Sequence, residues 1–131
     1  RITVMFDGVS CSSGQVLFIQ IGDSGGIEAT GYVSGAFSST ASGSFANATT
    51  TFVLSHSVTS VASNGFYGSV ILSNLDGNTW TSQGVLHVSP TYGCPIASAG
   101  TKTLSGTLDR LRIGFSTGDF DAGKVNIMYE G

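Results

Sequence analysis

Apolar and polar residues alternate along short runs of this sequence, and no window repeats its apolar residues every 3.6 positions. A period of two is typical of strands with one buried face, whereas an amphipathic helix needs the longer period. Turn signals such as Asn64-Gly65 and Asp76-Gly77 separate the runs, and Asp7-Gly8 and Ala122-Gly123 are interpreted in the same way. The runs predict strands over Ile2–Phe6, Gln15–Ile21, Gly31–Val33, Thr50–Val58, Phe66–Leu75, Trp80–Val88, Thr101–Leu104, Leu108–Ser116 and Lys124–Glu130.

About eight or nine short strands predict an all-β fold, an antiparallel β-sandwich or jelly roll. The length of 131 residues predicts one domain over residues 1–131. Only 10% of the residues are charged, while 40% are hydrophobic and 19 are glycine, a mixture that suits strands joined by tight turns. The stretch from Ser34 to Thr49, rich in Ser, Thr and Ala, is expected to be a long loop or a weak edge strand.

The last two predicted strands suggest a hairpin. Leu111, Ile113 and Phe115 alternate on one face, and Val125, Ile127 and Tyr129 alternate likewise. Folding the chain about Phe120 would place the two apolar sets opposite each other, facing one core. The same register would set Arg110 opposite Glu130 on the outer face.

The charge balance limits the partners of the chain. The net charge is −3 and only five residues are Lys or Arg, so no basic patch is available to neutralise phosphates, and nucleic-acid binding is not expected. The longest apolar runs, such as "VLFI", are too short to cross a bilayer, so membrane insertion is not expected either. The first residue is Arg1 rather than Met, and the chain is expected to be either a fragment of a longer polypeptide or a processed chain.

The stretch "GDSGG" around Ser24 matches the surroundings of the nucleophile in chymotrypsin-like proteases. A nucleophilic serine needs a histidine base, an orienting carboxylate and an oxyanion hole. In that family the histidine precedes the serine, whereas here His56 and His87 both follow it, and the chain after Ser24 is far too long for that fold. The stretch is therefore expected to be a glycine-rich turn between two strands, and no catalytic residue is assigned.

Other residues that could carry chemistry lack the spacing that would indicate a site. His56 shares a face with Phe52, Leu54 and Val58, so a packed core or interface histidine is expected. Two histidines and two cysteines dispersed along the chain do not fit a zinc site, and no metal or cofactor is expected. Cys11 and Cys94 lie among turn residues, and either a disulfide or two separate thiols fits the sequence.

The acidic residues support no metal or catalytic site either. Asp119 and Asp121 in "GDFDAG" lack the remainder of a calcium loop, and a polar hairpin loop is expected there. Asp23 and Glu28 are too isolated to indicate a glycosidase pair.

Aromatic residues offer a candidate carbohydrate-binding platform. Trp80 shares strand parity with Leu86 and Val88, so core packing is expected for it. Tyr67 is a second candidate, and Tyr92, in the loop Pro90–Pro95, is the better exposed one. Candidate contact loops follow from the turn assignments, and their representatives are Asn47, Asn78 and Tyr92.

Two segments together resemble a module of bacteriophage structural proteins. They are "IQIGDSGGIEATGYVS" at residues 19–34 and "KTLSGTLDRLRIGFSTGDFDAGKVNIMYEG" at residues 102–131. The resembling module is usually seen at the C-terminus of predicted tail or tail-fibre proteins, with a variable middle rich in Ser, Thr and Asn. The resemblance covers about 46 residues as motif and brings no catalytic residues with it. Cys11 and Cys94 lie outside the pattern.

The resemblance implies a non-enzymatic virion component exposed to the medium, a tail fibre or similar projection that contacts other virion proteins and a host surface glycan or protein. Alternatives are a head-decoration or stabilising fibre protein without a receptor, and a carbohydrate-binding module. Phage fibre modules are commonly trimeric, so a homotrimer is implied as well, with outer apolar residues, Val53 or His56 among them, at subunit contacts.

Overall fold

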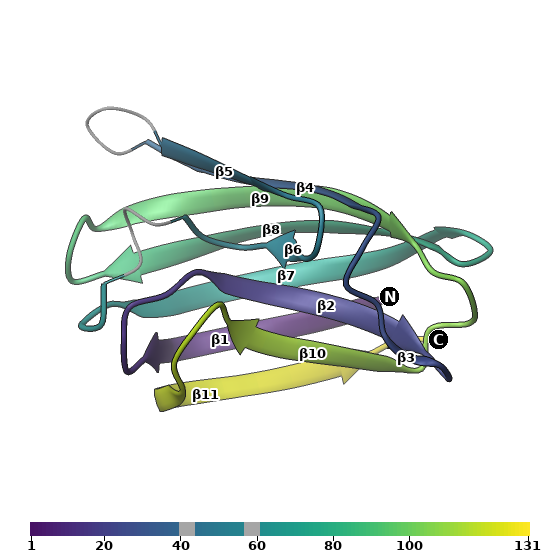
Figure 1. Cartoon of the computed structure of the whole chain (residues 1–131). Coiled ribbons are helices and arrows are strands. Elements are labelled where there is room, and N and C mark those ends of the chain that lie inside the picture. Colours follow the sequence, from purple (N-terminus) through teal and green to yellow (C-terminus); the bar gives the residue numbers. More distant parts are fainter. Residues whose placement is uncertain (40–43, 57–60) are drawn as a thin grey trace.

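The computed structural model describes residues 1–39, 44–56 and 61–131, and all of their regular secondary structure is β-strand. The strands form two antiparallel sheets that pack face to face (Figure 1). The prediction of an all-β antiparallel sandwich is confirmed, and the finer assignment of a jelly roll stays a prediction. Among the described residues there is no helix long and apolar enough to span a membrane.

The larger sheet has seven strands in the order β11-β1-β7-β8-β9-β4-β5. Their bounds are β1 Ile2–Cys11, β4 Tyr32–Ser38, β5 Ser44–Ala48, β7 Gly65–Asp76, β8 Thr79–Ser89, β9 Cys94–Thr103 and β11 Phe120–Tyr129. The smaller sheet is built around β2 (Leu17–Asp23), which pairs with β10 (Arg110–Phe115) along one edge. Its other edge pairs with the short strands β3 (Gly26–Ile27) and β6 (Phe52–Val53).

The core lies between the two sheets and is made by alternate residues of their inner faces. Val4 of β1, Val70 of β7 and Ile96 of β9 are fully buried from the larger sheet, and Ile19 and Ile21 of β2 are fully buried from the smaller one. Strands that bury one face need this period of two, which is the pattern that the sequence shows. Trp80 is buried with them, as predicted.

The predicted hairpin of the last two strands is wrong in its pairing. Leu111, Ile113 and Phe115 of β10 lie opposite Ile21, Ile19 and Leu17 of β2, in the smaller sheet. The apolar residues of β11 instead lie opposite β1 in the larger sheet. Alternation specifies the face that a residue occupies but not its neighbouring strand, because any antiparallel partner with the same period fits. Arg110 therefore bonds Asp109, and Glu130 pairs with Arg1, rather than with each other.

Two of the predicted turns are irregularities inside longer strands. The register between β1 and β11 shifts between Asp7 and Ser10, and Gly8 and Gly123 both have positive φ there, 66° and 92°. A side chain on Gly123 would collide with the backbone of Gly8, so the two glycines allow the bulged strands to approach each other. Turn signals and bulges use the same residue, and this is why Asp7-Gly8 and Ala122-Gly123 were misassigned.

The structure describes eleven strands rather than eight or nine. Of the two expectations for the Ser34–Thr49 stretch, the edge strand is right, because β4 runs through to Ser38 and β5 is the last strand of the larger sheet. The predicted strand over Thr50–Val58 forms only β6, and its end at Val58 lies outside the described residues.

Candidate functional site

Ser24, the residue at the centre of the protease-like stretch, lies exposed in the turn between β2 and β3. The Asp23 carboxylate accepts a hydrogen bond from the Gly25 N–H at 2.8 Å, which closes the turn locally. A side chain on Gly22 would collide with the backbone of Gly26 across this hairpin. The glycines of the stretch therefore serve a tight turn, as predicted from its context.

The carboxylates that flank this turn belong to a partly buried polar cluster, which we call the polar corner: Asp23, Glu28, Lys102 and Ser105. Asp23 and Lys102 are buried, Glu28 is half-buried and Ser105 is exposed. The Lys102 side chain is only 5% exposed and forms an ion pair with the Glu28 carboxylate. It also donates to the Thr103 carbonyl at 2.7 Å. The Ser105 backbone N–H donates to Glu28 Oε1 at 2.8 Å, and the Ser105 hydroxyl lies 2.6 Å from the same oxygen and 2.9 Å from Asp23 Oδ2.

These contacts stabilise the charged form of Glu28. Hydrogen bonds from Lys102 and from Ser105 lower the pKa of Glu28 from 4.5 to about 2. Tyr32 covers the corner from β4, and its ring centroid lies 5.5 Å from the Lys102 ammonium. The Tyr32 hydroxyl accepts from the Ile21 N–H at 2.9 Å and lies 3.0 Å from the Glu28 carbonyl oxygen, its hydrogen-bond acceptor. Burial raises the pKa of Tyr32.

The polar corner is a closed set of contacts that joins the two sheets. Glu28 is paired with Lys102, and Asp23 is held by hydrogen bonds from Gly25 and Ser105, so the contacts are those of a structural cluster. The sequence analysis missed Lys102 and Ser105. The available signal was parity, because Lys102 falls on the inward-facing alternation of β9, where a lone lysine needs a buried partner.

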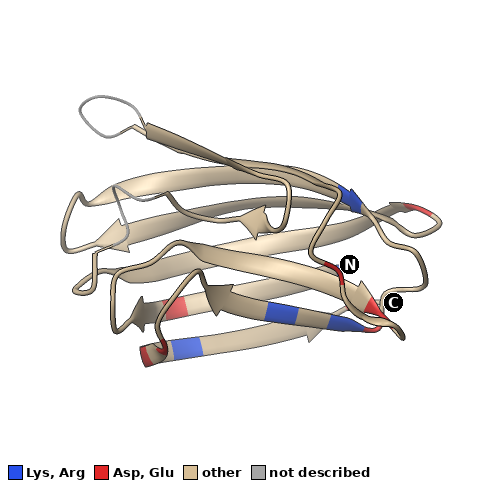
Figure 2. Ribbon diagram, viewed as in Figure 1, with Lys and Arg blue, Asp and Glu red and all other residues tan. Residues whose placement is uncertain are grey.

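In contrast to the charged polar corner, the outer surface of the larger sheet is largely uncharged. Figure 2 shows the charged residues gathered toward β1, β10, β11 and the strand ends, leaving the ribbons of β4, β5, β8 and most of β9 uncharged. Strands β4, β5 and β8 contain no Asp, Glu, Lys or Arg, and the one such residue in β9, Lys102, points inward. We call the outward side chains of these strands the neutral face: Val33, Phe37, Phe45, Asn47, Thr81, Gln83, Val85, His87, Ala97, Ala99 and Thr101.

Large apolar side chains stand exposed on the neutral face. Phe45 is 71% exposed, Val33 is 70% exposed, and Phe37 lies directly opposite Phe45 on the neighbouring strand. The register continues this row across the sheet from Phe37 to Ala97 and from Ala97 to Val85. An exposed apolar patch framed by polar groups is typical of a contact surface rather than of a free one.

Two shallow hollows lie along this row. One, of about 320 Å³, is lined by Phe37, Phe45 and Asn47 together with small residues of β9. The other, of about 450 Å³, is lined by Gln83 and Val85 and by residues of β7 and β9. Gly35 leaves room for the Asn47 amide, because a side chain there would lie 3.1 Å from Asn47 Oδ1. The hollows therefore combine apolar walls with amide groups that can donate and accept hydrogen bonds.

The three contact residues that the sequence analysis named do not meet. Asn47 lies on the neutral face. Asn78 lies in the turn before β8, where its carbonyl accepts from the Leu104 N–H at 3.0 Å. Tyr92 lies exposed in the turn after β8, with a φ of 75°. The two turns are at opposite ends of β8, so only Asn47 joins the apolar row.

The other aromatic candidates for a carbohydrate-binding platform do not lie together either. Trp80 is buried, while Tyr67 is exposed on the outer side of β7 opposite His87. The sequence analysis missed Phe37 and Phe45 as surface residues. Their signal was an outward strand parity in a region without charges.

His56 is buried, and its Nε2 lies 2.5 Å from the hydroxyl of Ser38, which is also buried. Burial lowers the pKa of His56, which favours the neutral imidazole. The prediction of a packed, hydrogen-bonded histidine is confirmed, although its expected neighbour Val58 lies outside the described residues. The suggestion that Val53 or His56 lies at a subunit contact is wrong for this arrangement, because both side chains are buried within the chain.

Cys11 and Cys94 are both buried and both free thiols. Of the two alternatives that the sequence left open, the structure has the separate thiols, and Cys11 donates to the Thr117 carbonyl at 3.3 Å. Asp121 lies within β11 and accepts a hydrogen bond from the Ser10 hydroxyl at 2.5 Å. Within the described ranges, no three Asp, Glu, His or Cys side chains gather as a metal site would require.

Comparison of the chain with protein-family models, with curated proteins and with solved structures found no match. The resemblance to phage structural modules therefore stays a prediction that rests on the two motif segments.

Proposed function

We propose that this chain is a non-enzymatic structural module of a bacteriophage virion, displayed on a tail fibre or similar projection, and that its neutral face contacts a host surface glycan or protein. The observation that carries the proposal is that different parts of the chain build the frame and the exposed surface. The two segments that bear the resemblance form one frame, and the segment between them supplies most of the neutral face.

The frame is built from contacts between residues far apart in sequence. β2 pairs with β10 from the second segment along six residue pairs, and four of them, from Ile19 to Gly22, lie within the first segment. Glu28 from the first segment contacts Lys102 and Ser105 from the second, at sequence separations of 74 and 77 residues. The middle segment supplies core residues such as Val70 and Ile96, so the sandwich requires its inward-facing residues. Its outward-facing residues can vary while the fold is kept, as expected of surfaces that change with the partner they contact.

The chemistry of the neutral face favours an uncharged partner. Sugar rings present C–H groups that pack against aromatic and aliphatic side chains, and their hydroxyl groups bond amides and hydroxyls. Phe37 and Phe45 supply the first kind of contact, and Asn47 and Gln83 supply the second. A neutral polysaccharide therefore fits this surface better than a polyanion does, because no cation lies among its described side chains.

The experiment is a glycan array probed with the wild-type chain and with the double variant F37A/F45A. We expect binding to neutral glycans, at least a tenfold loss in the variant, and unchanged binding by the matched control L75A, which removes an exposed apolar side chain outside the neutral face. If the chain binds no glycan and no host surface protein but is still incorporated into virus particles, the proposal is wrong and the alternative of a decoration or stabilising protein is favoured. Equal loss in L75A would remove the neutral face as the site.

A further inference from the structure

The edge strand β11 carries apolar residues that face the core side of the larger sheet but are left uncovered. Every residue of β11 is exposed. Val125, Ile127 and Tyr129 are 39%, 47% and 72% exposed, whereas their partners Phe6, Val4 and Ile2 on β1 are buried. The cause is that the smaller sheet ends at β10 and no strand of it lies over β11 (Figure 1).

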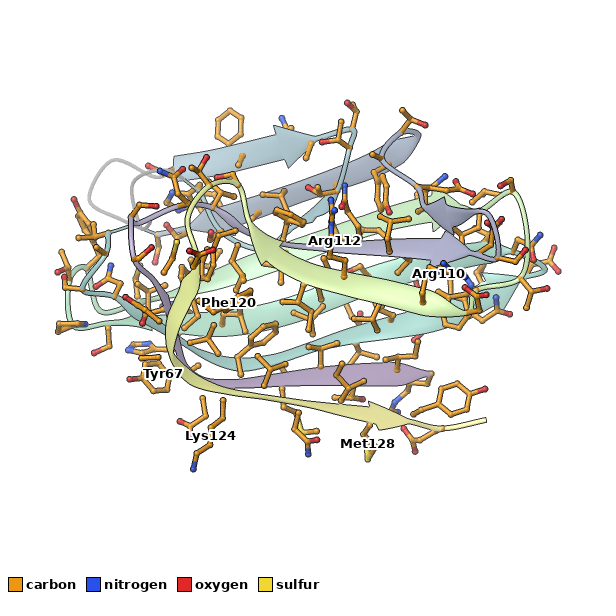
Figure 3. The ribbon with its side chains drawn as sticks, turned by 60° about the horizontal axis from the view of Figure 1, so that its bottom comes forward. Tyr67, Arg110, Arg112, Phe120, Lys124 and Met128 are labelled. Atoms are coloured by element: carbon orange, nitrogen blue, oxygen red, sulfur yellow. The ribbon has the colours of Figure 1, made fainter. Side chains whose placement is uncertain are left out.

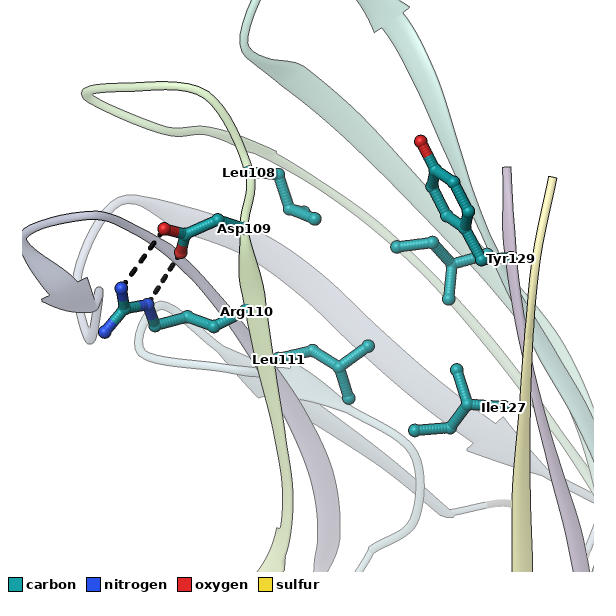
Figure 4. Close-up of a pocket in the computed structure, with 7 residues that line it drawn as sticks. Leu108, Asp109, Arg110, Leu111, Ile127 and Tyr129 are labelled. Carbon is teal, nitrogen blue, oxygen red and sulfur yellow. Dashed lines mark hydrogen bonds and ion pairs between the residues drawn. The ribbon is translucent and has the colours of Figure 1, made fainter. Parts of the chain in front are cut away.

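A groove of about 390 Å³ opens between β10 and β11 at this side of the sandwich. Leu108 and Leu111 project from one wall, and Ile127 and Tyr129 project toward them from the other (Figure 4). The groove is therefore an extension of the core that nothing in the described part of the chain fills.

The backbone of β11 also offers unused hydrogen-bonding groups. The amino group of Arg1 donates to the Glu130 carbonyl at 2.9 Å, and the Glu130 N–H donates to the Arg1 carbonyl at 2.8 Å. In an antiparallel pair such residues alternate with residues that face away, so the even-numbered residues of β11 from Lys124 onward direct their N–H and C=O groups toward β1. By the same alternation, the N–H and C=O groups of Val125, Ile127 and Tyr129 point to the free edge of the sheet. The Ile127 N–H points to the same edge, where the side chain of the neighbouring Asn126 accepts its hydrogen bond at 3.0 Å; a strand docked there would replace that local contact.

We propose that a second copy of this chain docks on this edge, with the two β11 strands antiparallel about a two-fold axis at Ile127. Ile127 then lies opposite Ile127 of the partner subunit, and Val125 lies opposite Tyr129 of the partner subunit. In this register the outward N–H and C=O groups of both strands meet each other, and the uncovered apolar residues of both copies join into one cluster. The inference is independent of the proposed function.

Charge selects this register. Lys124 and Met128 point away from the sandwich on the outer side of β11 (Figure 3). Glu130, the residue after β11, continues their alternation through its backbone bond to Arg1. Pairing about Ile127 places Lys124 opposite Glu130 of the partner subunit, twice, whereas a register centred on Lys124 would place two lysines together. Moving the axis by one or two residues either way removes both ion pairs. Glu130 also contacts Arg1 of its own chain at 3.0 Å, so two cations would share it.

The other free edge of the larger sheet, β5, is less suited to docking a second strand. β5 has five residues and no charged side chain, so nothing there fixes a register. Long exposed edges with apolar side chains are the ones that recruit another strand. A two-fold dimer is also distinct from the homotrimer that the resemblance implies.

The test is the mass of the whole chain in solution across a concentration series, measured by sedimentation. We expect the wild type to reach twice the 13.4 kDa of the single chain. K124E and E130K should each stay monomeric, because each sets like charges opposite each other twice in its own dimer. An equimolar mixture of K124E and E130K should dimerise again, since both cross-strand pairs become complementary.

The mixture serves as the control for folding, because two misfolded chains would not restore each other. A wild type that is monomeric at all concentrations, or trimeric, overturns the proposal. A dimer that neither K124E nor E130K weakens, or a mixture that stays monomeric when each variant does, overturns it as well.

Discussion

The polar corner and the neutral face are built by opposite rules. The corner pairs a buried lysine with the half-buried Glu28 and links it to the buried Asp23 through Ser105, while the face exposes phenylalanine and valine side chains without a charged residue among them. Burying charge is costly unless it is paired, so the buried Lys102 ammonium depends on the contacts of the corner. The comparison indicates that the corner fixes how the two sheets meet, and that the face is free to make contacts outside the molecule.

This difference predicts unequal responses to the same kind of change. A change of charge in the corner removes the only carboxylate that is paired with the buried Lys102 ammonium in the described residues. A change of charge on the neutral face acts on groups that water already surrounds.

Removal of the Glu28 carboxylate should have the largest effect on stability. E28A leaves the buried Lys102 ammonium without its counter-charge, and breaking a buried pair in this way costs about 3 kcal/mol. The free energy of unfolding, measured by urea titration, should fall by that amount.

The double variant E28A/K102M separates loss of the pair from loss of the fold. It removes the unpaired charge, so it should be more stable than E28A alone. If E28A and the double variant lose the same stability, the ion pair is not what holds the corner together.

A change of pH should act on the same carboxylate with a smaller effect. The pKa of Glu28 is lowered in the folded chain to about 2 from 4.5, so the folded state favours the charged form. Its stabilising contribution is complete above about pH 4.5 and is lost as the pH falls toward 2. The urea midpoint of the wild type should therefore approach that of E28Q over this interval. A constant gap between the two chains from pH 7 to pH 2 would contradict the assignment.

The sequence predicted the strands of the frame better than their partners. The inward alternation of Leu111, Ile113 and Phe115 was right, because burial on one face imposes a period of two. Their pairing with β2 was not predictable, because Ile19 and Ile21 present the same pattern as Ile127 and Tyr129. Whether β10 pairs with β2 or with β11 depends on how the two sheets pack, and local sequence does not determine that packing.

The candidate surface was predictable only in part. Asn47 was named, but Phe37 and Phe45 were hidden in a stretch that looked like a loop, since Ser and Gly interrupt the apolar pattern there. The polar corner needed contacts between residues more than 70 positions apart, and no local spacing could indicate them. The absence of charge over β4, β5 and β8, which defines the neutral face, becomes visible in the sequence only when the strands have been placed.

The smallest effect on stability is expected on the neutral face. Val85 lies exposed at the end of the apolar row, beside the second hollow. V85K puts a charge where water can solvate it and breaks no hydrogen bond, so the free energy of unfolding should change by about 0.5 kcal/mol or less. Binding to a neutral partner should nevertheless fall, because the lysine must be desolvated when the partner covers it. The two measurements together test the comparison: E28A should destabilise the chain, whereas V85K should weaken binding and leave unfolding unchanged. A large loss of stability in V85K would mean that the neutral face is part of the folding core rather than a contact surface.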